Sequence, residues 1–95
     1  MLLVDTSVWI DHLRSGEERL TRLLENGEVV VHPFVIGELA CGNLRNRQEI
    51  LSLLADLPRV ESVSYDEVMF FIGRHVLHGR GLGFVDVNLL ASCAV

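Results

Sequence analysis

The 95-residue sequence contains no lysine, only two cysteines and two prolines, and no long apolar run. The absence of lysine excludes the phosphate-binding loop of nucleotide hydrolases, which requires that residue. Cys41 and Cys93 lie far apart and outside any CxxC pattern, so we predict reduced core thiols and no zinc site. No apolar stretch reaches the ~18 residues of a membrane span, and no basic region precedes the apolar N-terminus, as it would in a signal peptide. We therefore expect a cytoplasmic protein without membrane contacts.

The charged residues give a net charge of -5, and all eight basic residues are arginine. An acidic protein has no general electrostatic attraction to nucleic acid, so a simple sequence-reading binder is not expected. Acidity still permits a nucleic-acid substrate where metal ions neutralise the site. The composition, 49% hydrophobic and 22% charged, is that of a globular chain, and the length predicts a single domain over residues 1–95.

Apolar periodicity and turn residues predict strands that alternate with helices along the chain. Short buried strands are predicted at residues 1–4, 28–32 and 59–63. Helices are predicted after an N-cap at Asp5, around residues 20–24, from Pro33 to Gly42, around residues 50–57, from a Ser64 capping box to residue 76, and over residues 85–95. This order predicts an α/β fold, a parallel sheet with helices on both faces.

Three otherwise uncharged segments each keep one carboxylate. Asp5 is the only charge in residues 1–10, Glu38 the only one in residues 33–44, and Asp86 the only one in residues 81–95. Asp5 follows the first strand, where parallel sheets place their ligands, and Asp86 opens the last helix, whose N-terminus favours an anion. N-capping is the alternative explanation for both aspartates. Glu38 lies mid-helix among apolar residues, so it caps nothing and is expected to point inward.

The scarcity of partners for these acids predicts a metal. A buried carboxylate is unfavourable unless it is paired or binds a metal ion. No arginine lies within the three segments, and clustered carboxylates would repel one another. A hard cation removes both difficulties, and oxygen ligands suit Mg²⁺ or Mn²⁺. We therefore predict that Asp5, Glu38 and Asp86 form one metal site.

The segments around these acids resemble the motifs of a known family, the PIN-domain ribonucleases, and specifically the VapC-type toxins of bacterial toxin–antitoxin pairs. The three segments are residues 1–10 (MLLVDTSVWI), residues 32–40 (HPFVIGELA) and residues 81–91 (GLGFVDVNLLA). The likeness covers the whole chain, with the three motifs in the order that the family has them.

The resemblance implies a metal-dependent endoribonuclease that hydrolyses RNA phosphodiester bonds with metal-activated water. It implies that Asp5, Glu38 and Asp86 are the catalytic residues and hold Mg²⁺ or Mn²⁺. Thr6 or Ser7 matches the position where the family keeps a hydroxyl near the first acid. It also implies a homodimer, and an antitoxin partner that covers the site.

The chain departs from the family pattern at its end. The family usually continues with another strand, a further aspartate and a final element, and Val95 comes before all of these. We therefore expect a C-terminally truncated PIN-like domain that lacks the last strand and the fourth acid. The alternative to the enzyme is a weakly active or inactive form that serves as a dimerisation or antitoxin-binding module. A dinucleotide-binding domain is disfavoured, because residues 79–83 (GRGLG) do not match GxGxxG and follow a helix.

The remaining polar and aromatic residues are given structural roles. His32 is predicted to end the second strand, and His75 to lie in the core or at its edge. Trp9 is predicted to be a core residue, with stacking on a base as the alternative. Four arginines are predicted to be solvated, with contacts to RNA phosphates as the alternative: Arg14, Arg45, Arg47 and Arg80.

Overall fold

The computed structural model describes the backbone of residues 2–94 and the side-chain burial of residues 2–92. It divides into two compact units, Met1–Val60 and Glu61–Val95, which we call the N-terminal unit and the C-terminal unit and describe separately. The single domain predicted over residues 1–95 stays a prediction. No helix in the described part of the chain is long and apolar enough to cross a membrane.

The N-terminal unit contains a parallel pair of strands, β1 (Leu2–Leu3) and β2 (Val29–Val30), with Leu2 opposite Val29 and Leu3 opposite Val30. Beyond β2, Val31 forms a single parallel bridge with Arg59. The α/β class with a parallel sheet is therefore confirmed, but each strand is shorter than the sequence predicted. The third strand, expected over residues 59–63, is reduced to this bridge, because the polar residues 61 and 62 are exposed and bury nothing against a sheet.

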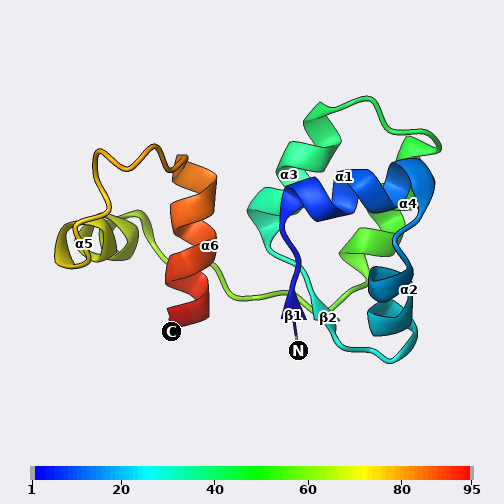
Figure 1. Ribbon diagram of the computed structural model, residues 1–95, viewed down its shortest axis with the longest axis horizontal. Coiled ribbons are helices and arrows are strands. Elements are labelled where there is room, and N and C mark those ends of the chain that lie inside the picture. Colours follow the sequence, from blue (N-terminus) through cyan, green and yellow to red (C-terminus); the bar gives the residue numbers. More distant parts are fainter. Residues whose placement is uncertain (1, 95) are drawn as a thin grey trace. The chain divides into compact units, whose positions relative to one another are not determined.

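Four helices complete the N-terminal unit: α1 (Thr6–Ser15), α2 (Glu18–Glu25), α3 (Pro33–Cys41) and α4 (Arg47–Ala55). The sequence predicted all four, and α1 ends at a glycine. Gly16 adopts a φ of 78°, a left-handed conformation that glycine tolerates better than other residues. Helix α1 packs against α3, and α3 against α4 (Figure 1).

The core of the N-terminal unit comes from the strands and from one face of each helix. Its buried apolar residues are Val4, Trp9, Leu20, Val29, Val31, Val35, Leu39 and Leu54. Cys41 is exposed, so the prediction that it is a core thiol is wrong. It ends α3 on the side opposite to the buried pair Val35 and Leu39. The side chain of Cys93 lies outside the described residues.

The C-terminal unit is a pair of packed helices, α5 (Tyr65–Arg74) and α6 (Phe84–Ala94) (Figure 1). Their shared core consists of Val68, Val87 and Ala91, with partly buried apolar residues around them. The predicted capping box is present at the start of α5. The backbone N–H of Ser64 donates to Glu67, and the Ser64 hydroxyl accepts from the Glu67 N–H. These contacts lower the pKa of Glu67, because they favour its charged form.

Candidate functional site

Asp5 is the N-cap of α1 and lies directly after the first strand. Its Oδ1 accepts a hydrogen bond of 2.8 Å from the backbone N–H of Thr6, and its Oδ2 accepts one of 3.1 Å from the Ser7 hydroxyl. The extended backbone of Asp5 (φ -70°, ψ 155°) carries the chain from the strand into the helix. The capping role is thus confirmed. The carboxylate is nevertheless exposed, which leaves it accessible to a ligand.

Thr6 joins the first two acids predicted for the site. While its N–H donates to Asp5, its hydroxyl donates to Glu38 Oε1 over 2.6 Å. The second bond connects residues 32 positions apart and links α1 to α3. Asp5 and Glu38 are therefore brought to one place, because both accept hydrogen bonds from a single threonine. The fold achieves this because α1 and α3 pack against each other.

Glu38 is exposed, so the prediction that it points inward is wrong. Residues four positions apart share a helix face, and the buried face of α3 carries Val35 and Leu39. Glu38 belongs instead to the neighbouring face with Phe34, which is 39% exposed. The apolar residues around Glu38 in the sequence therefore bury the adjacent face of the helix and leave the carboxylate in solvent.

Asp86 belongs to the C-terminal unit, in the first turn of α6. Its Oδ2 accepts a hydrogen bond of 3.2 Å from the backbone N–H of Gly83, at the end of the glycine-rich loop. Its carboxylate is exposed, like those of Asp5 and Glu38. Within each unit, the described residues bring no three His, Cys, Asp or Glu side chains together as a metal site. The meeting of Asp86 with Asp5 and Glu38 therefore stays a prediction.

Asp5 and Glu38 form a pair of oxygen donors that fits a hard divalent cation. Among the described residues, neither carboxylate forms an ion pair, since the salt bridge present joins Arg22 to Glu18 on α2. Their hydrogen-bond donors are neutral, the Thr6 hydroxyl on Glu38 and the Thr6 N–H and Ser7 hydroxyl on Asp5, so the negative charge of both carboxylates is left uncompensated. Carboxylate oxygens are the ligands that Mg²⁺ and Mn²⁺ prefer. The donor set present in the N-terminal unit is therefore compatible with either ion.

His32 has a structural role that the sequence analysis missed. It is completely buried and caps α3, since its Nδ1 accepts a hydrogen bond of 3.0 Å from the Phe34 N–H. This acceptor role requires the neutral imidazole. Burial lowers the pKa of His32, because removal from water disfavours the charged ring. The signal in the sequence was Pro33, which suits the first helical position and makes the residue before it the N-cap.

The aromatic residue exposed beside these acids is Phe34. Trp9 is only 2% exposed, so its core role is confirmed and it cannot stack on a base. Phe34 lies one turn before Glu38, and its ring contacts the His32 ring edge-on at a centroid distance of 5.2 Å.

Of the four arginines considered for RNA contacts, Arg47 donates to the carbonyl oxygen of Ala40 over 2.8 Å and so closes the end of α3.

The comparisons with known proteins agree with the motifs. The PIN domain family model matches residues 2–95. Ribonuclease VapC32 of Mycobacterium tuberculosis, from strain CDC 1551 / Oshkosh, is 53% identical over all 95 residues of the chain, which cover 77% of that relative. The protein of the same name from strain H37Rv gives the same identity and coverage. No solved structure matches the chain.

The buried His32 cap predicts that the N-terminal unit loses stability in acid. Because folding lowers the pKa of His32, the unfolded chain binds more protons below the ordinary value of ~6.5. The contribution of His32 is therefore present above that pH and is lost as the pH falls through the folded pKa. Urea unfolding should show a smaller difference between pH 7.5 and pH 5 in His32→Asn, which keeps an N-cap acceptor, than in the wild type. The matched variant is His78→Asn, at an exposed position. A difference reduced equally by both variants would contradict this role.

Proposed function

The chain belongs to the PIN-domain family, and we propose that it is a metal-dependent endoribonuclease, the toxin of a bacterial toxin–antitoxin pair. The observation that carries the proposal is Thr6, which holds Asp5 and Glu38 together at the start of α1. The identity of 53% to a ribonuclease over the whole chain supports the same activity. RNA is the proposed substrate, and the cytoplasm, where RNA and an antitoxin are available, is the proposed location.

We assign the metal to Asp5, Glu38 and Asp86, with Mg²⁺ or Mn²⁺ as the ion. Such an ion, when bound, lowers the pKa of a water molecule and stabilises the leaving oxygen of the phosphodiester. The three carboxylates supply its oxygen ligands and bring their negative charge to the place where the ion is needed. Thr6 and Ser7 keep the carboxylates of Asp5 and Glu38 in position, because their hydrogen bonds restrict the rotation of these two groups. No histidine base is required in this arrangement.

The proposed partners are an antitoxin protein and a second copy of the chain. Exposed carboxylates without arginine partners would attract a cationic segment, so an antitoxin that covers them would neutralise the site and exclude the metal. This supports the antitoxin on electrostatic grounds. The homodimer is proposed from the resemblance to the family.

RNA cleavage tests the proposed function directly. We expect the chain to cut a mixed cellular RNA in the presence of Mn²⁺, and to stop when EDTA removes the metal. Asp5→Asn keeps the shape and the capping ability of Asp5 but removes its charge, so the rate should fall at least ~100-fold. Asp11→Asn, an exposed aspartate on the same helix, should cut normally. A folded, metal-replete chain that leaves RNA intact would contradict the enzyme and favour a binding module.

The Thr6 hydroxyl should be required for metal binding, because it positions Glu38. Residues that orient a metal ligand typically change affinity or activity by about 10–100-fold when they are removed. Thr6→Val should therefore weaken Mn²⁺ binding by about tenfold or more in calorimetry, and lower kcat in parallel. Thr6→Ser, which keeps the hydroxyl, should restore both. Thr21→Val removes a comparable hydroxyl from α2 and should change neither quantity. Equal effects of the valine and serine variants at position 6 would contradict the positioning role of the Thr6 hydroxyl.

A further inference from the structure

Phe34 lies on the face of α3 that carries Glu38, beside the paired acids of the N-terminal unit. Residues four positions apart on a helix face the same side, with their Cβ atoms about 5–6 Å apart. Helical side chains also lean toward the start of the helix, so the Glu38 side chain leans over the turn that carries Phe34. Both residues belong to α3, so a single helix fixes their neighbourhood. RNA that reaches Glu38 therefore also reaches the Phe34 ring.

The Phe34 ring is held in place by the buried His32. The Phe34 N–H donates to His32 Nδ1 over 3.0 Å, and the two rings pack edge-on at a centroid distance of 5.2 Å. His32 is completely buried, so it gives the ring a fixed support. Phe34 nevertheless stays 39% exposed. An aromatic ring that is supported on one side and open to solvent offers a surface on which a planar group can stack.

The segments around the paired acids offer RNA no positive charge. Residues 1–10 and 33–44 contain no arginine, and the net charge of the chain is -5. Side chains of these segments therefore cannot hold RNA through its phosphates. Stacking of a base on an aromatic ring requires no positive charge, and every base has a face that can take part. Phe34 supplies such a contact one helical turn from Glu38.

We propose that Phe34 is a substrate-binding residue, on which the base next to the scissile phosphate stacks. The inference rests on the proposed ribonuclease, because it places the base relative to a phosphate held at the metal. Asp5 and Glu38 hold the ion that receives the phosphate, and Phe34 holds the base one helical turn away. The ring acts on the RNA and not on the metal. A phenyl ring has no hydrogen-bonding group, so it contributes affinity with little preference among bases.

An apolar contact with a protein partner is the other use of an exposed phenylalanine. Such a contact accepts any apolar side chain of similar size, whereas stacking requires an aromatic face. The position of Phe34 favours RNA, because a phosphodiester must come to Asp5 and Glu38 in every turnover of the proposed enzyme. The flanking base then necessarily lies near the turn that carries Phe34.

Steady-state cleavage of a short single-stranded RNA in Mn²⁺ tests the stacking. Phe34→Leu keeps an apolar side chain but removes the aromatic face, so KM should rise at least about fivefold while kcat changes less than about twofold. Phe34→Tyr keeps the ring and should behave like the wild type. The Mn²⁺ affinity of Phe34→Leu should equal that of the wild type, in contrast to Thr6→Val.

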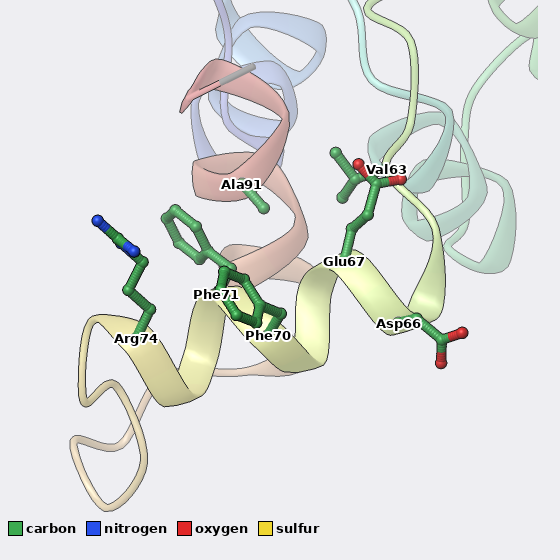
Figure 2. A pocket seen from close by; sticks show the side chains of 7 residues that line it. All are labelled: Val63, Asp66, Glu67, Phe70, Phe71, Arg74 and Ala91. Carbon is green, nitrogen blue, oxygen red and sulfur yellow. The ribbon is translucent and has the colours of Figure 1, made fainter.

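The matched control is Phe70→Leu, the same change at an exposed ring in the C-terminal unit. Phe70 lines a pocket whose described lining includes none of the three acids assigned to the metal (Figure 2). Phe70→Leu should therefore have the KM and kcat of the wild type.

Tryptophan fluorescence tests the contact with the base without requiring cleavage. The only tryptophan of the chain is the buried Trp9, so Phe34→Trp adds a single reporter at the stacking position. Mixing with the same RNA in Mg²⁺ should quench the emission of Phe34→Trp at once, before cleavage, and should leave the wild type unchanged. A duplex of the same sequence should quench less, because its bases are already stacked on one another.

The two proposals fail separately. An unchanged KM in Phe34→Leu, or unchanged emission of Phe34→Trp with an RNA that the chain cleaves, would overturn the stacking and leave the ribonuclease intact. Loss of Mn²⁺ affinity in Phe34→Leu would overturn it too, since the ring would then support the metal site. Quenching by RNA in a chain that cuts none would contradict the ribonuclease and support the contact with the base. A chain that neither cuts RNA nor changes its emission would overturn both.

Discussion

The hydrogen bond from the Thr6 hydroxyl to Glu38 is the contact on which the candidate site depends. It spans 32 residues of sequence at a distance of 2.6 Å, and the backbone of the same threonine holds Asp5. Two N-caps make this possible, because Asp5 fixes the start of α1 and His32 fixes the start of α3. The positions of the two carboxylates therefore follow from how two helices begin and from their packing against each other.

The electrostatics of this arrangement account for the metal ion that we propose. Two exposed carboxylates accept hydrogen bonds from the neutral groups of one threonine, Asp5 from its N–H and Glu38 from its hydroxyl, in a chain whose net charge is -5. Arginine neutralises neither of them among the described residues. Exposure to water makes such a pair tolerable without a ligand, whereas a divalent cation gains from both charges at once. The same site would be open to a cationic segment of an antitoxin. The metal ion and the antitoxin would then compete for the same negative charge.

Local signals predicted the helices and strands well, whereas it was harder to predict which side chains point into the core and which into solvent. Asp5, Pro33 and the Ser64 capping box mark helix starts through chemistry that acts within a few residues, and the structure has each of them. The direction of Glu38 was missed, because a helix rich in apolar residues all round gives no clear inner face, and packing chose Val35 and Leu39. The strands were predicted too long, since hydrophobic runs show where a strand lies but not how many residues find partners. The three acids were identified from scarce charge and from motifs, and the pairing of two of them required the fold.

The measurement that tests the central claim most directly is the broadening of amide signals by substoichiometric Mn²⁺ in nuclear magnetic resonance spectra. One ion held by Asp5, Glu38 and Asp86 should broaden the signals of all three residues and of Thr6 at the same metal concentration. Asp5→Asn should abolish the broadening at all three positions together. Broadening near Asp5 and Glu38 that leaves Asp86 sharp, or broadening at Asp86 that survives in Asp5→Asn, would contradict a single shared metal site.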